Sequence, residues 1–195
     1  DQLLNSPPDE IGWIRKNIPE SLSIVPSLGT YFLVINLDRA PFKDPRVRKA
    51  LALGIDREGI TGKLLQTGLD PAFTFVGPEY SDYPGASVPE RKLSFAERQK
   101  QARALMAEAG YGPGKPLTFQ YVYDTNEENR KIAVALAAMW QGIGARAEGV
   151  NVDFRQLNRQ IRTKNFDVAR WAYFGSYDDP YAMLQLLASD NTGNW

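Results

Sequence analysis

The chain has 195 residues, and its 23 lysines and arginines balance its 23 aspartates and glutamates. This length suits one large domain with a real core, and the balanced charge gives no sign of a nucleic-acid or anionic-membrane surface. Cysteine and histidine are both absent, which excludes disulfides, catalytic thiols, Ser-His triads and the common zinc sites; no metal or cofactor is expected.

The most strongly patterned stretch predicts a strand followed by two helices. The run from Tyr31 to Ile35 is aromatic and β-branched, which is typical of a strand. Asp44 before Pro45 has the order of an N-cap followed by proline at the first helical position. Asp56 can cap a second helix, which is expected to end near Gly68.

The second half of the chain alternates strands and helices. Strands are expected over Leu117 to Tyr123, Ala145 to Val152 and Phe166 to Tyr173. Ser94 and Thr125 each open a sequence that matches a capping box, and Asp153 can cap a further helix. A β-α-β-α-β order places the domain in the α/β class, with parallel strands in each βαβ unit.

The segment from Gly68 to Ser94 is rich in proline, glycine and aromatic residues, so it is expected to be a long loop. One interpretation is that its aromatic side chains attach the loop to the surface of the domain. The other is that they border a ligand cleft.

The candidate site lies where the last predicted strand ends, because ligands of open α/β sheets gather at strand ends. Five residues there are free to meet a ligand: Tyr173, Phe174, Ser176, Tyr177 and Asp178. Asp179 is expected to cap a final helix that begins at Pro180.

Three runs of residues carry a resemblance to a known family. They are Pro41-Phe42-x-Asp44-x-Arg46-Val47-Arg48-x-Ala50-Leu51, Ile55-Asp56-Arg57-Glu58, and the helix end from Ala104 to Tyr111. Together they resemble the extracytoplasmic solute-binding proteins of family 5, which serve peptide, oligopeptide and nickel ABC transporters. The resemblance implies one lobe of a periplasmic-binding-protein type II fold, an α/β domain whose mixed sheet is built from βαβ units flanked by helices.

The resemblance also implies a domain organisation and a function. Residues 1–30, with a short helix from Asp9 and a strand candidate from Ser21 to Val25, lead in from a missing first lobe. Residues 31–195 form the C-terminal ligand-binding lobe, truncated at its end. The implied protein is no enzyme: it binds an oligopeptide or related small solute between two lobes and delivers it to the permease of an ABC importer. We expect it in a bacterial periplasm or on the extracellular face of the cytoplasmic membrane.

Two further site residues follow from the resemblance alone. Arg170 matches a family arginine near the carboxyl end of the ligand, and Phe154 matches an aromatic residue that opens a helix. Ser176 stands where the oligopeptide-binding branch has an aspartate that holds the peptide's amino group. Either Asp178 replaces that aspartate or the ligand lacks a free amino terminus, so peptide, opine-like, sugar and metal-chelate ligands stay open.

Other interpretations remain at this point. Arg170 can instead form an ion pair with Asp167 or another acidic residue. The chain can be a hydrolase in which Asp178, alone or with Asp153 or Asp167, supplies acid and base. It can also be a sensor or chaperone lobe that binds a partner protein through exposed aromatic residues between Phe73 and Tyr83.

Overall fold

The computed structural model describes residues 8–24 and 27–191. Its helices and strands are α1 (Pro8–Asn17), η1 (Pro19–Ser21), β1 (Gly29–Ile35), α2 (Ala40–Lys43), α3 (Pro45–Leu53), α4 (Arg57–Gly59), η2 (Ile60–Leu65), η3 (Pro89–Lys92), α5 (Phe95–Glu108), β2 (Leu117–Asp124), α6 (Glu127–Gln141), β3 (Ala145–Val152), α7 (Phe154–Arg162), β4 (Val168–Phe174), α8 (Tyr181–Leu184) and η4 (Gln185–Leu187). The short helix expected near Asp9 is present as α1. The strand expected from Ser21 is absent over residues 21–24, and Val25 lies outside the described residues.

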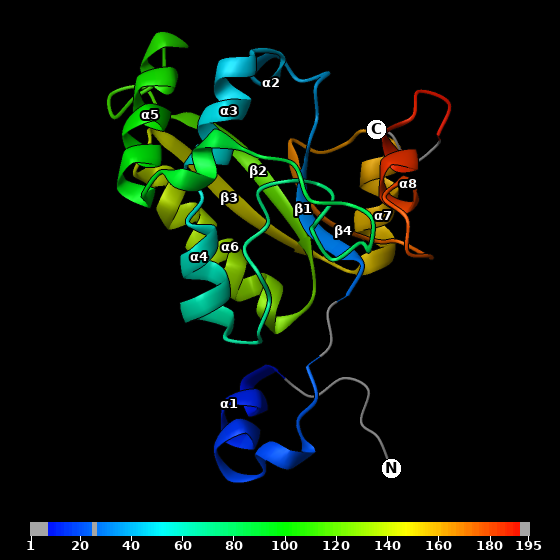
Figure 1. Cartoon of the computed structure of the whole chain (residues 1–195). Helices are drawn as coiled ribbons and strands as arrows, with labels where there is room; N and C mark the ends of the chain where they lie inside the picture. Colours follow the sequence, from blue (N-terminus) through cyan, green and yellow to red (C-terminus); the bar gives the residue numbers. More distant parts are fainter. Residues whose placement is uncertain (1–7, 25–26, 192–195) are drawn as a thin grey trace.

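A four-stranded mixed sheet organises the domain, with strand order β1-β4-β2-β3 (Figure 1). Strand β2 pairs in parallel with both β3 and β4, whereas β1 pairs antiparallel to β4. In this register Gly29 lies opposite Phe174 and Ile35 lies opposite Val168. The mixed α/β class and the parallel β2-α6-β3 unit are therefore confirmed.

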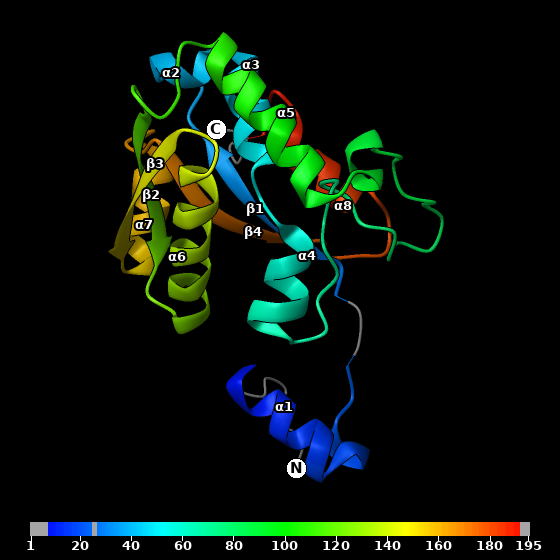
Figure 2. The ribbon, with the colours of Figure 1, turned by 90° about the vertical axis from the view of Figure 1, so that its left-hand side faces the viewer.

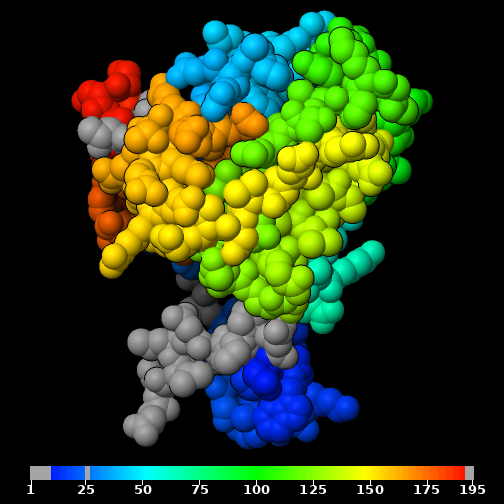
Figure 3. Space-filling view, turned by 180° about the vertical axis from the view of Figure 1, so that it is seen from behind, coloured from blue at the N-terminus to red at the C-terminus, as the bar shows by residue number. Residues whose placement is uncertain are grey.

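Helices cover both faces of the sheet. The larger core joins α3, α5 and α6 to one face of β2, and Figure 2 shows these helices on the same side of the sheet. The smaller core packs α7 against the other face through Leu157, Ile161 and Val122. Figure 3, seen from behind Figure 1, shows the yellow and orange residues of this region at the surface. Helix α1 lies apart from these layers (Figures 1 and 2).

Short-range hydrogen bonds explain where several helices begin. The Asp44 side chain accepts a hydrogen bond from the Arg46 amide (2.9 Å), and Asp153 accepts one from the Gln156 amide (2.9 Å). Ser94 and Glu97 form the predicted capping box.

Two predicted details of the helices are wrong. The cap of α6 is Asn126, which accepts from the Glu128 amide at 2.8 Å, because the Thr125 hydroxyl bonds to β3 instead. The helix after Asp56 does not continue as an α-helix to Gly68. Instead α4 passes into the π-helix η2, in a segment whose glycines and β-branched residues have low α-helix propensity.

Candidate functional site

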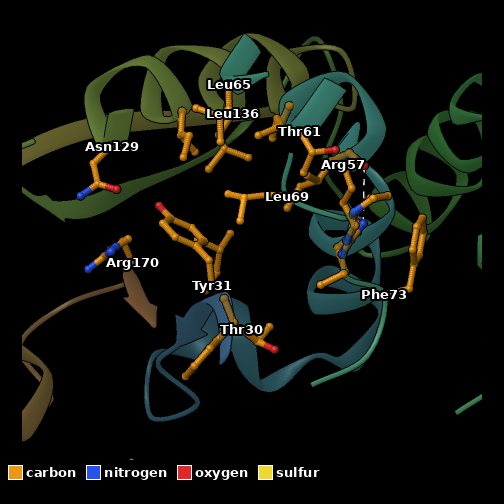
Figure 4. A pocket seen from close by; sticks show the side chains of 18 of the residues that line it. Thr30, Tyr31, Arg57, Thr61, Leu65, Leu69, Phe73, Asn129, Leu136 and Arg170 are labelled. Carbon is orange, nitrogen blue, oxygen red and sulfur yellow. Dashed lines mark hydrogen bonds between the residues drawn. The ribbon is translucent and has the colours of Figure 1, made fainter. Parts of the chain in front are cut away.

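A cavity of about 560 Å³ opens on the face of the sheet that carries α6 (Figure 4). Its walls come from β1, α6, the α4–η2 segment and the loop that follows η2, and most of the lining side chains are apolar. Asp124 at the end of β2 and Arg170 in β4 line it as well. Connections leave β2 over one face through α6 and return to β4 from the other face through α7, so the cavity lies at a topological switch point.

An ion pair closes one end of the cavity. Arg170 Nη1 lies 3.2 Å from Asp124 Oδ1, and the Arg170 guanidinium lies over the Tyr31 ring, 5.0 Å from its centroid. Asn129, from the first turn of α6, donates a hydrogen bond to Asp124 Oδ1 at 3.0 Å. Figure 4 shows Arg170, Asn129 and Tyr31 grouped at this end.

Two tyrosine hydroxyls continue the polar end of the cavity inward. The hydroxyls of Tyr31 and Tyr121 lie 3.1 Å apart in a hydrogen bond. Burial raises the pKa of Tyr31, and burial raises the pKa of Tyr121 still more. Both phenols therefore stay protonated at neutral pH. Tyr31, which lines the cavity, offers a neutral hydroxyl group there, and the buried Tyr121 supports it from behind.

The opposite end of the cavity is made by Arg57 and Phe73 (Figure 4). The guanidinium carbons of Arg57 and Arg98 each lie 5.1 Å from the centroid of the Phe73 ring. Arg98 is 1% exposed and forms a bidentate pair with Glu58, with contacts of 3.0 and 2.5 Å. These contacts attach the loop after η2 to α4 and α5, which fixes one wall of the cavity.

Replacing Arg98 by methionine is expected to lower the free energy of unfolding by about 2 kcal/mol. Methionine keeps most of the buried volume but removes both hydrogen bonds to Glu58 and the contact with Phe73, and the half-exposed Glu58 can be solvated instead. Urea denaturation measures the change. Arg103→Met, on the exposed face of the same helix, is the matched control, with a change within about 0.5 kcal/mol. Equal losses of unfolding free energy in the two variants would contradict the stabilising role given to the contacts of Arg98.

The effect of Arg98→Met also depends on pH. The hydrogen bond from Arg98 lowers the pKa of Glu58 in the folded state. The stabilisation by this pair is present above the ordinary pKa of glutamate and is lost as the pH falls through the lowered value. The difference in the free energy of unfolding between wild type and Arg98→Met should therefore become smaller below about pH 4.

The structure places the residues expected from the sequence in three environments. Arg170 lines the cavity, and its partner is Asp124. Asp167, the other acidic residue considered as a partner for Arg170, pairs elsewhere. Its Oδ1 lies 3.6 Å from Arg39 Nε, and its Oδ2 accepts a hydrogen bond from the backbone amide of Gln120 at 3.0 Å.

Phe154 lies on the other face of the sheet. Its ring stacks on Trp171 at 5.8 Å with an interplanar angle of 13°. Successive side chains of a strand point to opposite faces, so Trp171 and its partner face away from the Arg170 side. The structure does not bring Phe154 and Arg170 together.

The remaining expected residues form the segment after β4. Phe174, Ser176 and Tyr177 are exposed, and Phe174 lies opposite Gly29, which lines the cavity. Tyr173 packs instead on the small cluster of Val76, Tyr80 and Met183.

Both acidic residues of this segment have intramolecular partners. Asp178 accepts hydrogen bonds from the amide of Ser81 (3.0 Å) and from its hydroxyl, and these bonds lower the pKa of Asp178. Asp179 accepts a hydrogen bond from the Tyr181 amide (2.7 Å). Helix α8 begins at Tyr181, one residue later than predicted, and Pro180 rather than Asp179 is its N-cap residue.

Sequence reasoning missed several cavity residues, among them Tyr31, Asp124, Asn129, Arg57 and Leu69. A partial signal existed for Asp124, because it follows the predicted strand that ends at Tyr123. The others come from β1, α4, α6 and the loop after η2, and the packing of these elements on one another, which local patterns do not determine, brings them to the cavity.

The described residues show no group of three or more acidic side chains placed to hold a metal ion. Across the same residues, no helix has the length and apolar character needed to cross a membrane.

Comparison with known proteins identifies the family. The family profile described as "Bacterial extracellular solute-binding proteins, family 5 Middle" matches residues 1–195. The chain is 38% identical over 182 residues to the periplasmic murein peptide-binding protein MppA of Escherichia coli, covering 93% of this chain and 34% of MppA. It is 35% identical over 197 residues to the periplasmic oligopeptide-binding protein OppA of Salmonella typhimurium, covering 100% of this chain and 36% of OppA.

A solved structure agrees with this result. The structure of the Escherichia coli murein tripeptide binding protein MppA superposes with a TM-score of 0.91 at 36% identity, covering 96% of this chain and 37% of that chain. The chain thus spans about a third of the length of these relatives. It belongs to family 5 of the bacterial extracellular solute-binding proteins.

Proposed function

We propose that the full-length protein is the substrate-binding component of an ABC importer, and that it binds an oligopeptide or a related small solute for delivery to a membrane permease. Family membership supports this role, and the relatives MppA and OppA are described as periplasmic peptide-binding proteins. The observation that carries the proposal is the cavity of about 560 Å³ at the switch point of the sheet. Its volume and mainly apolar lining are typical of sites for small ligands.

The described domain supplies one lobe in this proposal. The chain covers about a third of the length of its relatives, and a protein of the relatives' length has room for a second lobe. Residues 1–30 lead in from that lobe, residues 31–195 form the ligand-binding lobe, and the two close on the ligand by a hinge motion. The working location is outside the cytoplasmic membrane, as for the periplasmic relatives.

The ligand is held in this proposal by the cavity together with the segment after β4. Arg170 lies at the cavity wall. Phe174, Ser176 and Tyr177 are exposed in the segment after β4, and Phe174 lies opposite Gly29, which lines the cavity. Tyr173, Asp178 and Phe154 are assigned supporting roles, because their side chains are already packed or hydrogen-bonded within the lobe.

No observation favours the two alternative functions. The three carboxylates considered for hydrolysis each accept a hydrogen bond from within the domain. The donors are Ser81 for Asp178, the backbone amide of Gln156 for Asp153, and the backbone amide of Gln120 for Asp167. The aromatic residues of the loop also face the domain, since Phe73 contacts two arginines, Phe75 packs on Phe32, and Tyr80 is buried.

Titration calorimetry of the full-length protein against short peptides tests the proposal. We expect micromolar or tighter binding, and about tenfold weaker binding in Leu69→Trp, because Leu69 lines the cavity and the larger side chain occupies ligand space. Leu37→Trp is the matched control. Leu37 is also about half exposed, but it follows the last residue of β1 and is not among the residues that line the cavity. Residues 1–195 alone should bind at least about tenfold more weakly than the full-length protein, because half of the cleft is absent. Equal peptide binding in Leu69→Trp and wild type would place the ligand elsewhere.

A further inference from the structure

The ion pair between Arg170 and Asp124 is shielded from solvent at the wall of the cavity. The Arg170 side chain is 19% exposed and the Asp124 side chain 17% exposed. At this burial, water screens the attraction only partly, so the two charges largely neutralise one another. A ligand group that approaches Arg170 therefore meets a guanidinium whose positive charge is balanced by the carboxylate of Asp124 beside it.

The Asp124 carboxylate is held in place by α6. Asn129 is 4% exposed, and its side-chain amide donates both to Asp124 Oδ1 at 3.0 Å and to the Asp124 carbonyl oxygen at 3.4 Å. These bonds link the end of β2 to the first turn of α6. Rotation of the Asp124 side chain away from Arg170 would remove the shorter of these two hydrogen bonds from the buried amide of Asn129, which carries an energetic cost.

The geometry distinguishes two kinds of ligand group at Arg170. A carboxylate placed against the guanidinium would lie within a few ångströms of the Asp124 carboxylate and would be repelled by it. A neutral carbonyl oxygen suffers little repulsion and can still accept a hydrogen bond. Arg170 lines the cavity, and its guanidinium carries several N–H groups, so it can donate such a bond to the carbonyl oxygen.

We propose that Asp124 determines the charge preference of the cavity: by neutralising Arg170 it makes the site select ligands with an uncharged carbonyl group there over ligands with a free carboxylate. This inference rests on the proposed function and makes it more specific, because it names the class of ligand end that the Arg170 end of the cavity accepts. Asp124 acts through Arg170 and is a positioning residue.

The test compares two tripeptides of the same sequence, one ending in a carboxylate and one in an amide, against the full-length protein. Calorimetry at neutral pH and low salt should show that wild type binds the amide about tenfold more tightly. Asp124→Asn keeps the size of the side chain and an acceptor for Asn129 but removes the charge that opposes the ligand carboxylate. The carboxylate peptide should then gain about tenfold in affinity, while the affinity for the amide changes little.

Asp38→Asn is the control, because Asp38 pairs with Lys164 at 3.0 Å on the exposed surface outside the cavity; it should leave the ratio of the two affinities as in wild type. If Asp124 had only a structural role, Asp124→Asn would weaken the binding of both peptides by the same factor, and that result overturns the inference. An unchanged ratio with both peptides bound also overturns it but leaves the proposed function intact. Failure of the wild-type protein to bind either peptide would overturn the proposed function and, with it, the inference.

Discussion

Replacing Asn36 by aspartate is expected to lower the free energy of unfolding by about 3–5 kcal/mol, although the two side chains have nearly the same shape. Asn36 is 4% exposed, and its Nδ2 donates to the carbonyl oxygens of Lys164 and Phe166, both at 2.9 Å. Its Oδ1 accepts from the Asp38 amide at 3.0 Å. An aspartate would lose both donated bonds and place a buried negative charge against two carbonyl oxygens.

Urea denaturation at several pH values checks this prediction. Burial should raise the pKa of the new carboxyl group in the folded state, so the loss of stability should be largest at neutral pH and smaller below about pH 4, where the group is protonated. Asn126→Asp makes the same chemical change at the N-cap of α6, where a carboxylate accepts the Glu128 amide equally well. We expect that control to stay within about 0.5 kcal/mol, and a similar loss at both sites would refute the role given to Asn36.

Replacing Trp140 by alanine is expected to cost about 4–5 kcal/mol of unfolding free energy. Trp140 is 0% exposed, its ring lies 5.3 Å from that of Phe119 between ring centroids, and its Nε1 donates to the Leu51 carbonyl oxygen at 3.0 Å. The truncation enlarges the existing cavity and removes the hydrogen bond to the Leu51 carbonyl oxygen near the end of α3. Thermal and urea unfolding measure the loss.

A milder variant keeps this prediction testable if the alanine variant fails to fold. Trp140→Phe retains most of the ring packing but removes the hydrogen bond, for an expected loss of about 2 kcal/mol. Trp13→Ala is the comparison, since Trp13 lies in α1 and is 57% exposed; its change should stay within about 0.5 kcal/mol. A loss in Trp13→Ala as large as that in Trp140→Ala would show that burial does not govern these effects.

Much of the fold follows from the local sequence. The strand from Tyr31, the cap at Asp44, the capping box at Ser94 and the strand from Leu117 all appear in the structure, because each depends on residues a few positions apart. The α/β class follows from the order of these elements.

The site depends more on contacts between distant residues and was harder to foresee. Asp124 and Arg170 meet only because β2 and β4 are neighbours in the sheet. Along the chain the two strands are separated by 43 residues, which include β3 and two helices. The cap of α6 shows the same limit on a small scale. Thr125 and Asn126 both suit an N-cap, and the bond from Thr125 to β3 decides between them.

The pairing of β1 with β4 has a consequence for biosynthesis. Ile35 lies opposite Val168, so the edge strand emerges from the ribosome long before its only hydrogen-bonded neighbour in the described sheet. At about 5–20 residues per second, this interval is on the order of ten seconds. During that time an aromatic and aliphatic nascent segment remains without its strand partner, and such unpaired strand edges favour aggregation before folding is complete.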